Sequence, residues 1–159
     1  MKTGEFGHYW EDFTVGETVV HQLRKTITEN DNVLFCNLTM NHHPLHLDSE
    51  YARGSQFGQR VVAGTYTLSL AVGISVEDIS GKAIANLGFS KVQHLAPVFI
   101  GDTISAETEI LDKRLSKHKP DRGIIEVETR AFNQNGVKVL VFTRQVLIPR
   151  RINKSSENG

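Results

Sequence analysis

The sequence predicts an α+β fold in which an antiparallel sheet of about five strands wraps around one central buried helix, at about residues 64–75. Three observations carry this prediction. The segment 61–75 has no charged residue, which is typical of a helix that is buried on all sides. Runs of alternating polarity follow Gly81, and turn signals separate them. A sheet of that size has one apolar face to cover, and no other helical segment is apolar enough to cover it.

A half-buried strand is the first expected element, over residues 17–28, where the sequence ETVVHQLRKTIT alternates. Val19, Leu23 and Ile27 fall on one side of that strand, and polar side chains fall on the other. We therefore expect these three residues to face the core.

A helix is expected next, over residues 30–40. Thr28 followed by Asp31 is the pattern of a capping box, in which each side chain binds the backbone N–H of the other residue. The apolar residues of this segment lie roughly at helical spacing, which predicts an apolar face made of Val33, Leu34, Leu38 and Met40.

Residues 41–46 are expected to form an ordered loop, because Pro44 cannot lie inside a helix. Asp48 then caps a short helix that Gly58 closes. In the central helix, Gly64 and Gly73 are expected to act as caps, because a glycine in a helix interior costs roughly 1 kcal/mol relative to alanine.

Four strands are expected after Gly81, and Asn135-Gly136 between the last two is a strong hairpin signal. We expect one domain over residues 1–150 and a flexible polar tail over residues 151–159. The four expected strands span residues 83–96, 103–115, 123–134 and 136–148.

Composition limits the classes of function. With 18 Lys and Arg against 18 Asp and Glu, the formal net charge is zero, which argues against a nucleic-acid partner. No apolar run approaches the roughly 18 residues of a membrane span, and the first residues lack the apolar stretch of a secretory signal. The lone Cys36 cannot form an internal disulfide. We therefore expect a cytoplasmic protein that does not enter a membrane.

Three histidines lie within five residues around Pro44: His42, His43 and His46. A solvated loop, or one core histidine with a backbone partner, would explain them. A metal site would need further ligands, and Pro44 disfavours the helical turn that two of them would need to share a metal, so we expect no metal. The remaining hypothesis is acid–base catalysis, for which imidazole is suited.

Gly64 is a second candidate, because it stands where the chain enters the buried helix. The N–H groups of Gly64 and Thr65 have no partner within such a helix, and a helix N-terminus stabilises negative charge on an oxygen. Glycine also lets a substrate carbonyl approach the backbone closely. Every buried helix has such an end, but a histidine loop upstream favours an oxyanion hole opposite a general base.

The stretch from Asn41 to Leu70, followed by APVFIGDTISAETEIL, strongly resembles the MaoC-like, (R)-specific enoyl-CoA hydratase branch of the hot-dog-fold proteins. The likeness covers about residues 10–148. The hydratase signature Asp-x-Asn-Pro-aliphatic-His aligns with the frame from Asn41 to His46, and Pro97 begins a match to PVFxGDTIxAExE. The segments TMNHHPLHLD and LSKHKPDRG resemble the mesaconyl-CoA and itaconyl-CoA hydratase group within that branch.

The resemblance implies that His46 is the hydratase histidine and that Gly64 supplies the oxyanion amide. The catalytic aspartate of the family falls on Asn41, and His43 stands where the signature has Asn. An amide such as Asn41 cannot accept a proton at neutral pH. His46 would then be the only proton carrier, with Asn41 positioning the water, or His43 would be a second titrating group. Alternatively, the chain binds acyl thioesters without hydrating them.

The activity that the resemblance implies is reversible hydration of a 2-enoyl-CoA, with no cofactor because CoA is part of the substrate. The acyl group is expected to contact Gly64, Thr65, Tyr66 and Ser69. The CoA phosphates are expected to meet cations near the turn at Pro120 and after the last strand. These cations are Lys113, Arg114, Lys117, Lys119, Arg122, Arg150 and Arg151.

Two other possibilities remain open. A hot-dog acyl-CoA thioesterase usually needs a carboxylate in or just before the helix, and residues 64–75 contain none. For the hydratase, Asp31 and Asp48 are the nearest carboxylates that could replace the aspartate missing at position 41, but both fit helix caps better. A non-catalytic acyl-CoA-binding module is the other alternative. For any of these, one helix leaves a sheet edge uncovered, so a homodimer or a dimer-based oligomer is expected.

Overall fold

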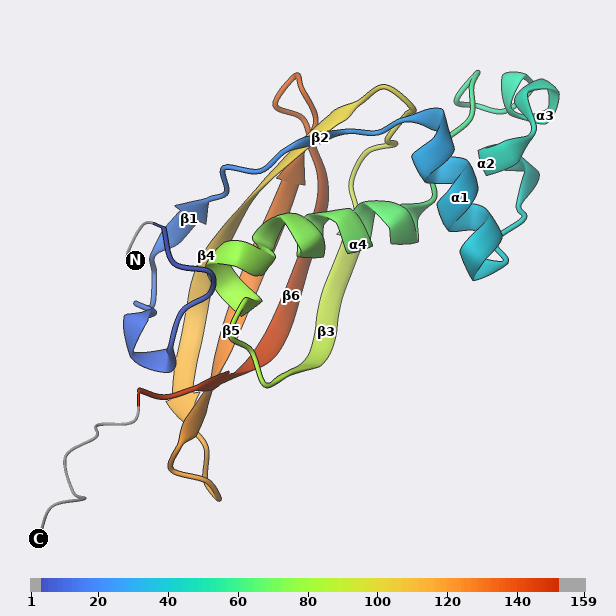
Figure 1. Ribbon diagram of the computed structural model, residues 1–159. Helices are drawn as coiled ribbons and strands as arrows, with labels where there is room; N and C mark the ends of the chain where they lie inside the picture. The colour runs from blue at the N-terminus through green and yellow to red at the C-terminus, as the bar shows by residue number, and fades with distance from the viewer. Residues whose placement is uncertain (1–3, 152–159) are drawn as a thin grey trace, which may run out of the picture.

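The structure is a computed structural model that describes residues 4–151 (Figure 1). An antiparallel six-stranded sheet has the order β1-β4-β5-β6-β3, and β2 pairs separately with β4. The sheet curves behind the helix α4 (Gly64–Ser75), as the predicted α+β fold requires. The strands are β1 (Thr18–Val20), β2 (Lys25–Thr26), β3 (Ala85–His94), β4 (Thr103–Leu115), β5 (Arg122–Phe132) and β6 (Lys138–Pro149).

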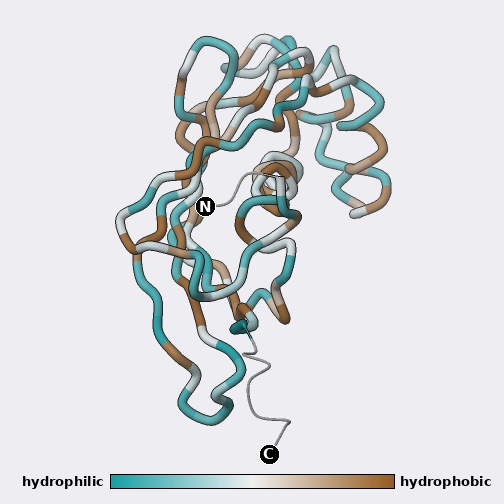
Figure 2. The backbone as a smooth tube through the Cα atoms, turned by 60° about the vertical axis from the view of Figure 1, so that its left-hand side comes forward, coloured by the Kyte–Doolittle hydropathy of each residue, from teal (hydrophilic) through white to brown (hydrophobic). Residues whose placement is uncertain are grey.

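The core lies between α4 and the concave face of the sheet. Buried residues alternate with half-buried ones along β4 and β5, which is the period-two pattern of a strand with one covered face. Ala71 and Ile74 of α4 belong to the same buried cluster as Ile104 and Phe142 of the sheet. Figure 2 shows hydrophilic residues gathered in the turns at both ends of the sheet.

One face of α4 is open in this chain, which corrects the expectation of a helix buried on all sides. Thr65, Ser69 and Gly73, spaced four residues apart, are exposed together. Gly73 lies inside the helix, which continues into the π-helical turn η2 (Val76–Ser80), so it is not a cap. The uncharged sequence predicted more burial because small residues suit either environment.

The expected strand over residues 17–28 is divided into β1 and β2, which both pair with β4. Between them the buried His21 places Nδ1 2.6 Å from Asp78 Oδ2 and Nε2 2.8 Å from Thr108 Oγ1. Residues 21–24 lie in neither strand, and Leu23 is exposed there while Ile27 is buried. The prediction that Leu23 faces the core is therefore wrong.

The helix α1 (Glu29–Thr39) begins with the predicted capping box of Thr28 and Asp31. Its predicted apolar face is wrong, because the buried residues are Asn32 and Cys36. Three of the four residues expected on that face, Leu34, Leu38 and Met40, are exposed.

Asn32 explains why a polar residue lies at the base of α1. Its side-chain amide donates to His46 O at 3.1 Å, and its Oδ1 accepts from the Ala63 N–H at 3.2 Å. α1 is thus anchored by hydrogen bonds to the loop and helix that follow it, which an apolar side chain could not form.

Two short helices follow α1. Pro44 is the first residue of α2 (Pro44–Leu47), where its missing N–H costs nothing, so the expected loop is helical from Pro44 onward. Asp48 caps α3 (Ser49–Arg53) as expected, with Oδ1 accepting from the N–H groups of Glu50 and Tyr51. The residue that closes α3 is Gly54, its C-cap, rather than Gly58.

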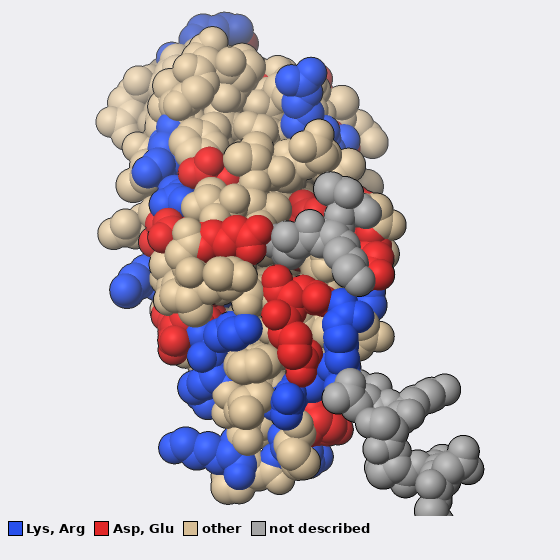
Figure 3. Space-filling model, turned by 90° about the vertical axis from the view of Figure 1, so that its left-hand side faces the viewer, with Lys and Arg blue, Asp and Glu red and all other residues tan. Residues whose placement is uncertain are grey.

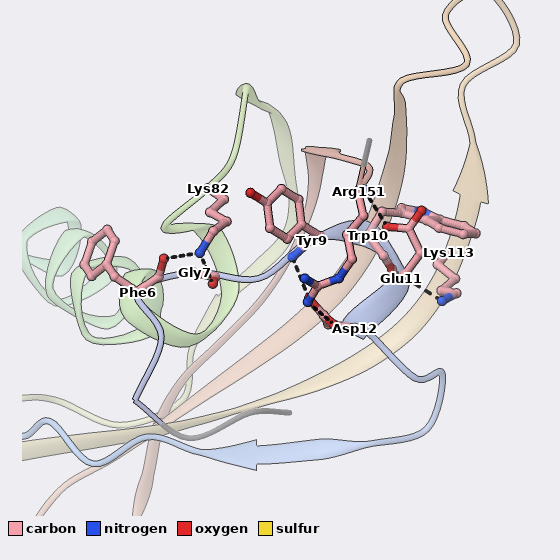
Figure 4. Close-up of polar contacts among 9 residues, drawn as sticks. All are labelled: Phe6, Gly7, Tyr9, Trp10, Glu11, Asp12, Lys82, Lys113 and Arg151. Atoms are coloured by element: carbon pink, nitrogen blue, oxygen red, sulfur yellow. Dashed lines mark hydrogen bonds and ion pairs between the residues drawn. The ribbon is translucent and has the colours of Figure 1, made fainter. Parts of the chain in front are cut away.

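The N-terminal segment, including the turn η1 (Trp10–Asp12), packs against the far end of the sheet (Figure 4). Lys82 Nζ donates to the carbonyl oxygens of Phe6 and Gly7, and Arg151 pairs with Asp12 at 2.7 Å. Arg151, which was expected in a flexible tail, is therefore bound, and the rest of that tail lies outside the described residues.

Among the described helices, none combines the length and the apolar character that a membrane span requires.

Candidate active site

His46 is held by α2 in a defined tautomer. Its Nδ1 lies 2.7 Å from the carbonyl oxygen of Val61. A carbonyl oxygen can only accept, so Nδ1 carries the proton and Nε2 of the neutral ring keeps a lone pair. The half-buried His46 can therefore accept a proton at Nε2.

The first turn of α4 presents two backbone donors. The N–H groups of Tyr66 and Thr67 both donate to Ala63 O, at 2.9 and 3.2 Å. This leaves the N–H groups of Gly64 and Thr65 at the positive end of the helix dipole. An oxygen that develops negative charge would be stabilised there.

His46 and Gly64 line one cleft of about 340 Å³. Two further side chains with polar atoms, Thr67 and His94, line it as well. Its walls are mostly apolar and come from Phe57, Val61, Val62, Leu95, Ala96, Pro97 and Val98. The geometry suits a small apolar group with one polarised oxygen.

His94 is not among the residues expected in the site. It ends β3, and a Cβ atom on Gly64 would lie 2.9 Å from its Cε1 atom. The contact joins a strand end to a helix start, and local sequence patterns carry no signal for such a contact.

Asn41 and His43 do not line this cleft. The N–H of Asn41 donates to Cys36 O at 3.0 Å, in the loop after α1. His43 is the N-cap of α2, and its Nδ1 accepts from the Leu45 N–H at 3.1 Å. The His43 ring is exposed, 5.9 Å between centroids from the ring of His46. The role of Asn41 in positioning the water and the role of His43 as a second titrating group stay predictions.

Of the four residues expected to contact the acyl group, only Gly64 lines the cleft. Thr65 and Ser69 lie on the exposed face of α4. Tyr66 packs edge-on against Phe35 of α1 at 5.4 Å, and burial raises the pKa of its hydroxyl. A contact between these three residues and a substrate therefore remains untested.

The cations that were expected to bind the CoA phosphates lie at the end of the sheet that is remote from the cleft. His94 pairs through β6 and β5 with the row of Ala106 on β4. Lys113 lies roughly 24 Å and Arg122 roughly 30 Å further along the strands. Figure 3 shows Lys and Arg gathered toward this lower end.

Four of the expected cations have partners in the chain, and two of them, Arg150 and Arg151, pair with Glu11 and Asp12. Lys113 Nζ donates to Phe13 O at 2.7 Å. It also lies 4.2 Å from the centre of the Trp10 ring (Figure 4). Arg122 pairs with Asp121 at 2.8 Å. Neither Lys113 nor Arg122 reaches the cleft of its own chain.

The nearby carboxylates act as caps. Asp31 belongs to the box at the start of α1, and Asp48 caps α3. The hydrogen bond from the Thr28 N–H lowers the pKa of the Asp31 carboxyl, and burial opposes this shift. In the part of the chain that the structure describes, no three His, Cys, Asp or Glu side chains are placed to hold a metal ion.

Comparisons with known proteins agree on one family. Residues 12–131 match the family model described as MaoC like domain. The chain is 34% identical over 151 residues to a mesaconyl-CoA hydratase of Cereibacter sphaeroides, covering 95% of this chain and 43% of that protein. It therefore spans less than half of that relative.

Two further matches are a relative that is covered over most of its length and a solved structure of the same fold. An (R)-specific enoyl-CoA hydratase of Aeromonas caviae is 30% identical over 128 residues, which cover 80% of this chain and 91% of that protein. A Mycobacterium tuberculosis protein with a double hot-dog fold matches with a TM-score of 0.84 at 20% identity, over 92% of this chain and 46% of that one. The sheet wrapped around α4 is thus a hot-dog fold.

Proposed function

Because this chain belongs to the MaoC-like domain family, we propose that it adds water reversibly across the double bond of a 2-enoyl-CoA thioester. One observation carries the proposal: His46, with Nε2 free to accept a proton, lines the same cleft as the first amide of α4. A general base and an oxyanion donor on one cleft are the two parts that this chemistry needs.

In the proposed mechanism, the thioester oxygen accepts a hydrogen bond from the Gly64 N–H. As the water oxygen bonds to C3, His46 Nε2 takes a proton from the water, and the electrons of the C2–C3 double bond move toward C2 and the thioester oxygen. His46 then returns a proton to C2. An oxyanion donor of this kind contributes about 10²–10³-fold in rate, and general acid–base catalysis about 10²–10⁴-fold.

Mesaconyl-CoA and itaconyl-CoA are the substrates that we propose to test first, because the chain is similar over 95% of its length to a mesaconyl-CoA hydratase. The cleft volume of about 340 Å³ also favours a short acyl group. CoA is part of the substrate, so the proposal includes no separate cofactor.

The proposal is tested by incubating the purified chain with crotonyl-CoA, mesaconyl-CoA and itaconyl-CoA. Enoyl absorbance and free thiol are followed together. Loss of absorbance without thiol release is the expected result. Release of thiol would indicate a thioesterase instead, and tight binding with neither change would indicate an acyl-CoA-binding module.

We also propose a homodimer, or an oligomer built from it, in which two copies pair through β3. This strand ends the sheet on one side, and all ten of its residues are exposed. Leu87, Phe89 and Val92 leave apolar surface there, at 49%, 45% and 39% exposure. An unpaired edge with apolar side chains favours pairing with a second copy.

The proposed location is the cytoplasm, which the single free and buried thiol of Cys36 supports.

A further inference from the structure

His94 is held against the first turn of α4 by the sheet. It is the last residue of β3, where it pairs with Leu140 of β6. A Cβ atom on Gly64 would lie 2.9 Å from Cε1 and 3.0 Å from Nε2 of the His94 ring. The ring therefore lies directly against the backbone of Gly64, and both residues line the cleft of His46.

The ring nitrogens of His94 are available to a ligand. Within residues 4–151 no group forms a hydrogen bond with this ring, and the residue is exposed. His46 of α2 and its N-cap His43 differ from His94, because Nδ1 of His46 is bonded to Val61 O and Nδ1 of His43 accepts from the Leu45 N–H. No partner thus fixes the tautomer of His94, and a bound acceptor can select the form that carries a proton on Nε2.

The geometry allows Gly64 and His94 to donate to the same oxygen atom. Nε2 lies 3.0 Å from the Cβ position of Gly64. A backbone nitrogen lies about 2.5 Å from its own Cβ position, so Nε2 and the Gly64 nitrogen are at most about 5.5 Å apart. Two N–H donors can share an acceptor up to a separation of about 5.8 Å, because each hydrogen bond spans about 2.9 Å.

Resting on the proposed hydratase function, we propose that His94 is a further catalytic residue that donates its Nε2–H to the thioester oxygen beside the Gly64 amide. Negative charge develops on this oxygen as water adds to C3, and two donors then share it. His94 keeps its proton throughout, while His46 takes and returns the proton of the water. Gly64 has a second role in this arrangement, because a Cβ there would displace the His94 ring.

The test compares His94→Phe, which keeps a ring but removes the donor, with His94→Gln, which keeps an N–H donor. His118→Phe is the matched control, since His118 is exposed in the turn between β4 and β5. The kcat and KM of crotonyl-CoA hydration are measured for each variant. In a His46→Ala background, in which turnover is slowed about 10²–10⁴-fold, the absorption maximum of bound 2,4-hexadienoyl-CoA reports how strongly the thioester carbonyl is polarised.

We expect His94→Phe to lower kcat about 10²-fold with KM within about threefold of wild type, as for loss of an oxyanion donor. The absorption maximum of bound 2,4-hexadienoyl-CoA should also shift less far to longer wavelength in this variant. His94→Gln should recover about tenfold of the lost kcat, and His118→Phe should match wild type. A kcat of His94→Phe within twofold of wild type would overturn the proposal. A raised KM with an unchanged kcat and an unchanged spectrum would also overturn it.

The two proposals fail in different ways. If the wild-type chain hydrates none of the three enoyl-CoA substrates, the proposed function is overturned. If it hydrates them and His46→Ala abolishes the reaction while His94→Phe changes neither kcat nor spectrum, only the role of His94 is overturned. Thermal unfolding of each variant separates loss of a donor from loss of the fold.

Discussion

At the scale of single residues, His46 and His43 both use Nδ1 in a hydrogen bond within the fold, but in opposite directions. His46 donates from Nδ1 to Val61 O and keeps Nε2 for chemistry. His43 uses Nδ1 to accept from the Leu45 N–H. The sequence places both histidines within two residues of Pro44, and only the family resemblance distinguishes them. Their hydrogen bonds separate a candidate base from a helix cap.

His46→Ala should lower the kcat of crotonyl-CoA hydration by about 10²–10⁴-fold, because it removes the proposed proton carrier. His42→Ala is the control, since His42 is exposed and lines no part of the cleft. Steady-state kinetics measure both variants. Full activity of His46→Ala would mean that another group activates the water.

His43→Ala should destabilise the chain by about 1 kcal/mol, the usual cost of losing an N-cap acceptor. His43→Asn should recover most of this, because its side-chain oxygen can accept from the Leu45 N–H. Urea unfolding measures the free energy, and kcat should fall less than tenfold in either variant. A loss of kcat as large as that of His46→Ala would instead make His43 the second titrating group.

At the scale of secondary-structure elements, Asn32 links α1 to both halves of the cleft. It binds the backbone of His46 on one side and the N–H of Ala63, the residue before α4, on the other. Asn32→Ala leaves these buried partners unsatisfied and should cost about 1–3 kcal/mol of unfolding free energy.

The Asn32→Ala variant should also lower kcat, since the relative positions of His46 and Gly64 depend on this link. Asn37→Ala is the matched control, because Asn37 is on the same helix and exposed. Urea unfolding and hydration kinetics would be measured on both. If kcat stayed at the wild-type value while stability fell, Asn32 would support the fold without positioning the site.

The capping box of α1 predicts a pH dependence. The hydrogen bond from the Thr28 N–H lowers the pKa of the Asp31 carboxyl in the folded chain, and Lys25 lowers it to a smaller extent. The stabilisation is therefore present above the unfolded pKa and is lost as pH falls through the lower, folded pKa. Asp31→Asn should be less stable than wild type at pH 7, and the difference should disappear at acidic pH. Thermal unfolding between pH 7 and pH 2 would check this; a difference independent of pH would exclude the charge as its source.

The elements differ in how well the sequence predicts them. The strands β4 to β6 were expected within two residues of their bounds, because alternation and turn residues are local signals. The exposed face of α4 and the buried Asn32 were not predicted, since both depend on what lies opposite. The candidate site was predicted in part: His46 and Gly64 follow from motif resemblance, but His94 meets Gly64 only through a contact between distant segments.

At the scale of the whole molecule, the edge strand β3 differs from the other strands of the sheet because all ten of its residues are exposed. β3 pairs with β6 across a long connection, which no local signal could predict. The described chain leaves the outer side of β3 unpaired and the neighbouring face of α4 open at Thr65 and Ser69. A second copy that extends the sheet at β3 would pair with the free backbone N–H and C=O groups of this edge and bury its apolar side chains.

Val92→Lys should convert the proposed dimer to single chains, because burying an unpaired ammonium at such an interface is costly. The matched control is Val137→Lys, since Val137 is 45% exposed in the turn between β5 and β6, away from β3. Sedimentation should give wild type and Val137→Lys twice the chain mass of 17.8 kDa and Val92→Lys that mass alone. A dimeric Val92→Lys chain would show that the copies join elsewhere, and the open face of α4 would then be the next surface to alter.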